Sequence, residues 1–200
     1  MPKIVDHDQY RKELLLKAFD LFAKRGYGSL TMRQLAQELG VSTGTLYHYF
    51  QSKEDLFLKL MEELAQQDFR EAELVLTNSG NRLEERIAAV FDWIEQREGT
   101  FVKQILVSIS FYQEQHNSKE LLEASQIIND IEEGYRQLCH QYLGIADPDL
   151  MNFIDNLIEG ITINRLFCPE QTSWRKQSQL LGKMLRAYIQ TYHREGSDGI

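Results

Sequence analysis

The sequence predicts an all-α fold of about nine helices. Apolar residues recur at three- and four-residue steps almost throughout the chain, which is the spacing of a helix face. Nowhere do apolar and polar residues alternate over the length that a half-buried strand requires. With 42% hydrophobic residues among 200, the chain can build one substantial core, or a small module fused to a larger one.

The first predicted helix has a basic end and a glycine stop. Its apolar face consists of Leu14, Leu15, Ala18, Leu21 and Phe22. Lys24 and Arg25 suit the negative end of the helix dipole, and Gly26 can adopt the left-handed conformation that closes a helix. We therefore expect this helix to end at residue 25.

Three further helix starts carry capping residues. Thr31 and Gln34 form a capping-box pattern that opens a short helix ending at Gly40. Ser42 is placed to cap a second short helix, and Ser52 a longer one with acidic residues in its first turn.

The rest of the chain divides into amphipathic runs. Turn-forming residues predict breaks at 78–81, near Gly99, and at 116–118, 144–148 and 168–172. The last two runs, within 150–161 and 180–192, carry wide stripes of bulky apolar residues. Since these stripes exceed one antiparallel packing face, we expect both helices also to contact a second copy of the chain.

The net charge of −8 is unevenly distributed. Residues 1–55 contain eight Lys and Arg against seven Asp and Glu, a net charge of +1, which leaves −9 for residues 56–200. An acidic body with a nearly neutral N-terminal part would approach a polyanion with that part first.

Several other classes of protein and site are disfavoured. The longest nearly apolar stretch, 105–112, is too short to span a bilayer, and the first residues lack the apolar run of a secretion signal, so we expect a cytoplasmic protein with no membrane contact. Cys139 and Cys168 have no metal-ligand spacing, and we expect neither a metal nor a cofactor. His48 has no nucleophile or orienting carboxylate at a motif-like spacing, so an enzyme is not expected.

Residues 31–50 have the pattern of a helix-turn-helix. Small Ala36 and the turn-forming Gly40 permit two short helices to cross closely, so that the second helix can enter a DNA major groove. The start of the second helix displays Ser42, Thr43, Gly44, Thr45, Tyr47, His48 and Tyr49. We interpret its small hydroxyl side chains as suited to base edges and phosphates, with Lys53 as a further phosphate contact.

The segment 31–50, preceded by Gly26-Tyr27 and followed by Ser52-Lys-Glu-Asp-Leu-Phe57, resembles the signature of the TetR family of transcriptional regulators. The resemblance covers about residues 10–60. It implies a DNA-binding domain at 1–52 and a helical ligand-binding and dimerisation domain at 53–200. It also implies a homodimer formed through the last two helices, and a repressor that a small-molecule effector releases from a pseudo-palindromic operator.

Carried over by position, the resemblance implies a recognition helix over 43–49, whose first three residues lie nearest the bases. Arg33 is then the candidate for a bidentate contact to guanine, and Thr31 for a phosphate contact. Position 43, often basic in this family, is threonine here. The full set of expected DNA-contacting residues is Thr31, Arg33, Ser42, Thr43, Gly44, Thr45, Tyr47, His48 and Lys53.

Some assignments stay open at this point. Phe50 is expected in the core, whereas Tyr49 could serve either packing or binding. An effector pocket in the body could be lined by Trp93, Phe101, Phe111, Tyr112, Tyr135, Phe153 and Asn156. Ordinary core packing is the alternative for each of them. The alternative for the whole chain is a helical dimeric interaction protein whose N-terminal part no longer reads DNA.

Overall fold

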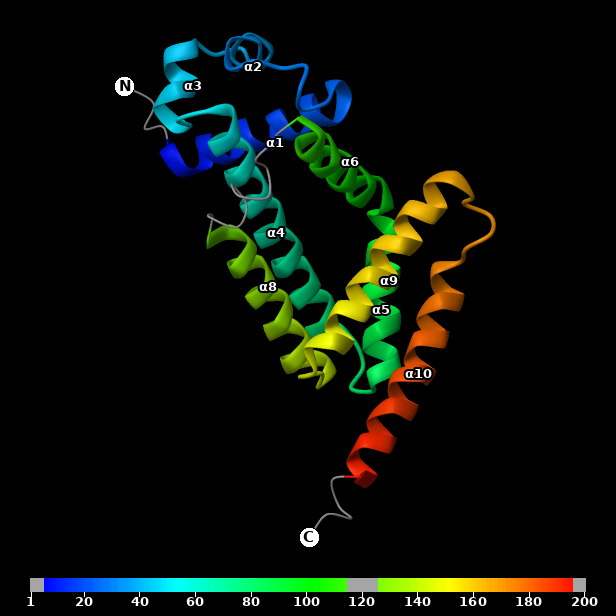
Figure 1. Cartoon of the computed structure of the whole chain (residues 1–200). Helices are drawn as coiled ribbons and strands as arrows, with labels where there is room; N and C mark the ends of the chain where they lie inside the picture. The colour runs from blue at the N-terminus through cyan, green and yellow to red at the C-terminus, as the bar shows by residue number, and fades with distance from the viewer. Residues whose placement is uncertain (1–5, 115–125, 196–200) are drawn as a thin grey trace. The chain divides into compact units, whose positions relative to one another are not determined.

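The computed structural model describes residues 6–114 and 126–195. Within these residues it contains nine α-helices, one π-helical turn and no strand (Figure 1). The elements are α1 (His7–Arg25), α2 (Met32–Leu39), α3 (Thr43–Tyr49), α4 (Lys53–Asn78), α5 (Leu83–Gln96), α6 (Glu98–Glu114), α8 (Gln126–Leu138), the π-helical turn η1 (Cys139–Leu143), α9 (Pro148–Phe167) and α10 (Trp174–Glu195). The predicted all-α fold is thus confirmed for the described residues, whereas the break expected at 116–118 lies outside them. No helix among them is long and apolar enough to cross a membrane.

The helix ends predicted from capping residues are confirmed. Gly26 and Gly40 have positive φ angles of 80° and 71° after α1 and α2, as a glycine stop requires. The amide of Asp55 donates to the Ser52 hydroxyl over 3.0 Å, so Ser52 caps the start of α4.

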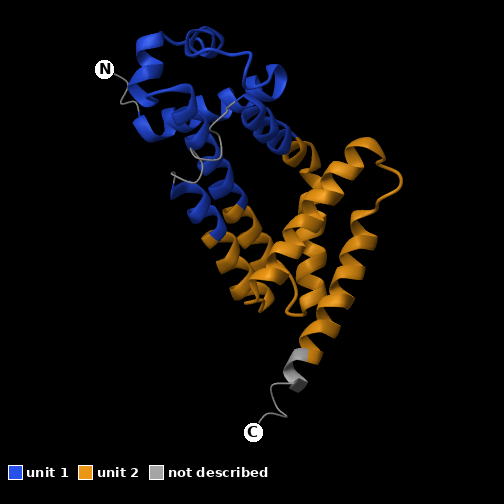
Figure 2. Cartoon of the chain, viewed as in Figure 1, with its two compact units in different colours: residues 1–68, 103–132 blue, residues 69–102, 133–200 orange. Residues whose placement is uncertain are grey.

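The chain forms two compact units (Figure 2). The head unit comprises residues 1–68 and 103–132, and the body unit comprises residues 69–102 and 133–200. The long helices α4, α6 and α8 each contribute residues to both units. The boundary that the resemblance implies, between residues 52 and 53, therefore falls within the head unit.

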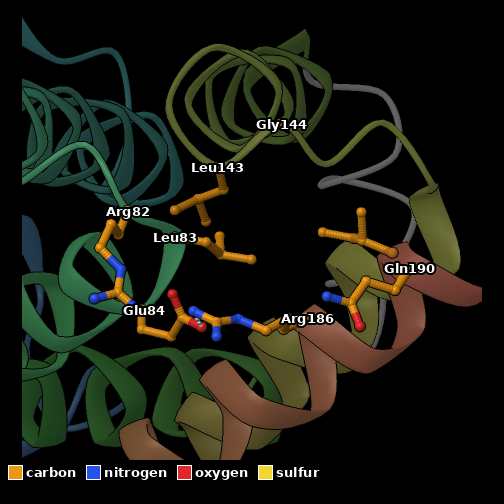
Figure 3. Close-up of a pocket in the computed structure, with 8 residues that line it drawn as sticks. Arg82, Leu83, Glu84, Leu143, Gly144, Arg186 and Gln190 are labelled. Carbon is orange, nitrogen blue, oxygen red and sulfur yellow. Dashed lines mark ion pairs between the residues drawn. The ribbon is translucent and has the colours of Figure 1, made fainter. Parts of the chain in front are cut away.

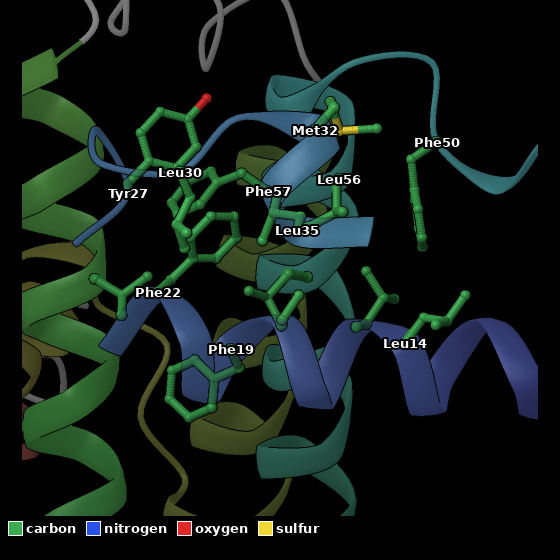
Figure 4. Close-up of a cluster of buried hydrophobic side chains, with 14 of the residues drawn as sticks. Leu14, Phe19, Phe22, Tyr27, Leu30, Met32, Leu35, Phe50, Leu56 and Phe57 are labelled. Atoms are coloured by element: carbon green, nitrogen blue, oxygen red, sulfur yellow. The ribbon is translucent and has the colours of Figure 1, made fainter. Parts of the chain in front are cut away.

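Aromatic side chains form the centre of the head core. Phe57 of α4 stacks on Phe111 of α6, with 4.0 Å between ring centroids and planes 4° apart. Tyr27 meets both rings edge-on. Figure 4 shows Tyr27, Leu30 and Phe57 gathered above Phe22 of α1. The helices α2 and α3 pack against this core.

The body core is organised around Trp174, at the start of α10. The indole is fully buried, lies edge-on to Phe91 of α5 and donates to the Glu98 carboxylate over 3.1 Å. Arg165 of α9 pairs with the same carboxylate and also donates to the carbonyls of Pro169 and Thr172. Glu98 thus holds the turn between α9 and α10 in place.

Candidate nucleic-acid interface

The two short helices of the predicted helix-turn-helix are fixed by local hydrogen bonds. The Thr31 hydroxyl accepts from the Gln34 amide over 3.3 Å, while the Thr31 amide donates to the Gln34 side chain over 2.9 Å. The Ser42 hydroxyl accepts from the Thr45 amide over 2.9 Å. Between them, the Val41 amide donates to the Ala36 carbonyl over 2.9 Å. The start of α3 therefore has a defined position relative to α2.

One side of α3 is anchored in the head core and the other is exposed. Leu46 and Phe50 are completely buried, which confirms the packing role expected for Phe50. The residues predicted to contact DNA lie on the other side: Thr45 is half-buried, and the exposed ones are Ser42, Thr43, Gly44, Tyr47 and His48. Half of the Tyr47 side chain, 51%, is exposed. The segment thus presents hydroxyls, an aromatic ring and an imidazole on one rigid surface.

Tyr49, which the sequence left undecided, contacts α1. Its hydroxyl lies 2.9 Å from Nδ1 of His7, and its ring meets that of Tyr10 edge-on. Tyr49 is half-buried there. Its contacts hold the end of α3 against the start of α1, which is a packing role.

The other predicted contact residues flank this surface. Thr31 and Arg33 are exposed at the start of α2. Lys53 is half-buried: its Nζ donates to the Tyr27 carbonyl over 3.2 Å and lies 4.0 Å from the centroid of the Tyr27 ring. Burial lowers the pKa of Lys53, although the neighbouring Glu54 and Glu114 act to raise that pKa. In this structure Lys53 holds the loop after α1.

Tyr27 is the positioning residue that sequence reasoning missed. It is fully buried, its amide donates to the Ser110 hydroxyl of α6 over 2.9 Å, and its own hydroxyl donates to Glu54 over 3.2 Å. It therefore ties the loop before α2 to both α4 and α6. In the sequence, the sign of this role was that an aromatic residue directly follows Gly26.

The residues predicted to line an effector pocket are divided between the two units. Phe111 is buried in the head core and Tyr112 is exposed on α6 in the head unit. The other five belong to the body unit: Trp93, Phe101, Tyr135, Phe153 and Asn156. Two pairs among the seven are in ring contact, Trp93 with Phe101 at 5.4 Å and Phe111 with Tyr112 at 6.2 Å. Their pocket stays a prediction.

An arginine lies beside the Trp93 and Phe101 rings. The Arg97 guanidinium lies 5.2 Å from the Trp93 ring and 5.5 Å from the Phe101 ring, and it pairs with Glu71 over 2.7 Å. Tyr135 donates to the Met151 carbonyl, whereas Phe153 and Asn156 are exposed on α9. In the described part of the chain, no group of three His, Cys, Asp or Glu residues is arranged to hold a metal.

Comparison with known proteins gives a match over the same segment. The family model "Bacterial regulatory proteins, tetR family" matches residues 14–60, from α1 into α4. The transcriptional activator FasR of Mycolicibacterium smegmatis is 34% identical over 91 residues, which are 44% of this chain and 42% of FasR. The transcriptional repressor KstR2 of the same organism is 33% identical over 95 residues, 46% of each protein. The match thus spans less than half the length of these curated relatives.

Solved structures match over most of the chain. A putative transcriptional regulator from Pseudomonas aeruginosa has a TM-score of 0.71 at 17% identity, over 96% of each chain. FadR from Bacillus subtilis, solved in complex with stearoyl-CoA, has a TM-score of 0.61 at 21% identity, over 87% of this chain and 96% of FadR. At these identities the likeness shows a shared fold.

Proposed function

The chain belongs to the tetR family of bacterial regulatory proteins, and we propose that it regulates transcription by binding operator DNA through α2 and α3. The observation that carries this proposal is the exposed side of α3. There, small hydroxyl residues stand beside Tyr47 and His48, while Leu46 and Phe50 anchor the helix in the head core. A recognition helix needs both a rigid base and an exposed polar surface.

The exposed residues divide by the part of DNA that they would contact. Thr43, Gly44 and Thr45 are short enough to let the helix approach base edges in the major groove. Tyr47 and His48 lie further along α3 and would contact phosphates or a thymine methyl group. Arg33 at the start of α2 would read a guanine. Thr31, Ser42 and Lys53 complete the proposed contact set.

The proposed assembly is a homodimer formed through α9 and α10. Large apolar side chains are exposed on these two helices, namely Phe153, Ile163, Leu166, Phe167, Leu180 and Met184. Contiguous exposed apolar residues are typical of an interface between protein subunits. Such a dimer would set two recognition helices about 34 Å apart, one turn of B-DNA, and read a pseudo-palindromic operator.

The proposed mode is repression that a small-molecule effector relieves. FadR from Bacillus subtilis, which shares the fold, has been solved with stearoyl-CoA bound. In this chain α4 and α6 contribute to both units, and α6 contacts the loop before α2 through Ser110 and Tyr27. An effector that prefers one arrangement of α4 and α6 would shift the population away from the DNA-binding form.

Selection of random double-stranded DNA on the purified protein tests the proposal. At about 0.15 M salt, the parent protein is expected to enrich a motif with two-fold symmetry. A Thr45→Ala, Tyr47→Ala variant is expected to enrich none, because the exposed surface of α3 has lost a hydroxyl and a ring. No enrichment by the parent at any salt concentration would favour a dimeric interaction protein instead.

A further inference from the structure

A recess in the body unit lies apart from every residue assigned so far (Figure 3). Its volume is about 470 Å³, within the range of pockets that hold small organic molecules. Three segments line it: residues 82–84 at the start of α5, residues 143–144 at the end of η1, and residues 186, 189 and 190 of α10. It contains none of the aromatic residues predicted for an effector pocket.

One part of the recess is apolar. Leu83, Leu143 and Ile189 supply this wall, and each side chain is half-buried. Figure 3 shows Leu83 and Leu143 pointing toward one another from α5 and η1. A smaller hollow of about 170 Å³ shares Gly144 and Ile189 with the recess. An elongated apolar group could therefore continue beyond Ile189.

The remaining lining carries a net positive charge. Arg82 and Arg186 stand against a single acid, Glu84, which pairs with Arg186. The absence of a side chain at Gly182 leaves room for Glu84, because a Cβ at position 182 would lie 3.1 Å from the Glu84 Cγ. Residues 56–200 as a whole carry −9, so two arginines beside one acid form a locally positive site. Guanidinium groups bind carboxylates through paired hydrogen bonds.

The wall formed by η1 is braced from two sides. Arg86 of α5 donates to the Tyr142 carbonyl, and the Tyr142 hydroxyl donates to Glu73 of α4 over 3.2 Å. Gly144 then ends the turn with a φ of 68°. Leu143 is thus held at the recess before any ligand arrives, which reduces the entropy cost of binding.

We propose that this recess binds an aliphatic carboxylate. The carboxylate binds the Arg82 guanidinium and shares the Arg186 guanidinium with Glu84, and the aliphatic chain lies along Leu83, Leu143 and Ile189. The net positive charge favours an anion over a cation. The apolar wall favours an anion that carries an aliphatic chain over a small inorganic anion. The binding itself does not depend on operator DNA, so it stands or fails separately from the proposed function.

Isothermal titration of the full chain with decanoate, without DNA, tests this inference. We expect saturable binding at one site per chain, with decan-1-ol and decylammonium at least about tenfold weaker because neither offers a carboxylate to the arginines. Arg82→Gln is expected to weaken decanoate binding at least about tenfold and to leave decan-1-ol unchanged. Arg82 is exposed, so its replacement leaves the core intact.

Two further variants locate the site. Ile189→Asn is expected to weaken both decanoate and decan-1-ol, because the wall for the aliphatic chain becomes polar. Arg175→Gln, an exposed position of α10 outside the recess, is the matched control and is expected to bind decanoate like the parent. Absence of decanoate binding, decan-1-ol as tight as decanoate, or binding unaffected by both Arg82→Gln and Ile189→Asn would overturn the inference.

Discussion

The recognition segment of the head unit and the last two helices of the body unit expose different kinds of side chain. Among the described residues, α3 exposes Thr43, His48 and the polar-tipped Tyr47 around its buried Leu46, and its N-cap Ser42 is exposed as well. By contrast, α9 and α10 expose large hydrocarbon side chains, of which Phe167 is the most accessible at 75%. Both regions nevertheless rest on buried hydrophobic cores.

This difference assigns a different partner to each surface. Base edges and phosphates are polar, and short hydroxyl side chains can bind them without burying unpaired groups. Large apolar side chains contribute favourable free energy only when another apolar surface covers them and removes them from water. The two surfaces therefore fit the partners proposed for them, nucleic acid for α3 and a second copy of the chain for α9 and α10.

The largest expected effect concerns α6, where two adjacent aromatic residues differ in burial. Phe111→Ala should lower the free energy of unfolding by about 3–5 kcal/mol, because it leaves a cavity against the stacked Phe57 ring. Tyr112→Ala, at a position that is 53% exposed, should change it by less than about 0.5 kcal/mol. Denaturant titration of both variants measures this, and similar losses would contradict the assignment of Phe111 to the head core.

The next effect concerns self-association. Phe167→Asp should weaken the dimer at least about tenfold, because a carboxylate would replace a ring at the proposed apolar interface. Sedimentation equilibrium measures the dimer dissociation constant. Leu74→Asp is the matched control, since Leu74 is 62% exposed on α4, outside the last two helices. An equal effect of both variants would place the interface elsewhere.

The Glu98 carboxylate connects stability of the body unit to pH. Hydrogen bonding from Arg165 lowers the pKa of Glu98, and hydrogen bonding from Trp174 contributes in the same direction. The resulting stabilisation is present above the ordinary glutamate pKa of 4.5 and is lost as pH falls through the lowered pKa. Glu98→Gln should therefore cost about 1–2 kcal/mol at neutral pH and progressively less in acid.

Melting curves of the parent and the Glu98→Gln variant from pH 7 down to pH 3 measure this difference. The difference in stability between the parent and the variant should shrink as the pH falls. A difference in stability that stays constant across this range would show that the Glu98 charge has no part in holding the turn between α9 and α10.

The smallest effect concerns the cap of α3. Ser42→Ala should lower the free energy of unfolding by about 1 kcal/mol, because the Thr45 amide loses its acceptor. Ser42→Asp should retain the cap and most of the stability. Urea titration distinguishes the two, and equal stability of both variants would show that the cap does not fix the start of α3.

The features that could be predicted from sequence are local in the chain. Thr31 with Gln34, Ser42 with Thr45, and the glycines at 26 and 40 act within a few residues of one another, so their pattern alone indicates helix ends. The periodicity of the apolar residues likewise predicted the helical fold. The exposed side of α3 could also be predicted, because α3 is a single short helix that buries only one side.

The features that escaped prediction depend on residues far apart in the chain. Nothing in the periodicity of α6 distinguishes Phe111, buried on Phe57, from the exposed Tyr112 beside it. The bond between Tyr27 and Ser110 joins positions 83 residues apart. Such contacts are set by how helices pack.

Binding of the selected operator by two tyrosine variants tests the central claim most directly. Tyr47 and Tyr112 are exposed to almost the same extent, 51% and 53%, on α3 and α6. Fluorescence anisotropy should show that Tyr47→Ala weakens operator binding at least about tenfold, while Tyr112→Ala binds like the parent. Equal affinities of the two variants would contradict the assignment of α3 as the surface that reads DNA.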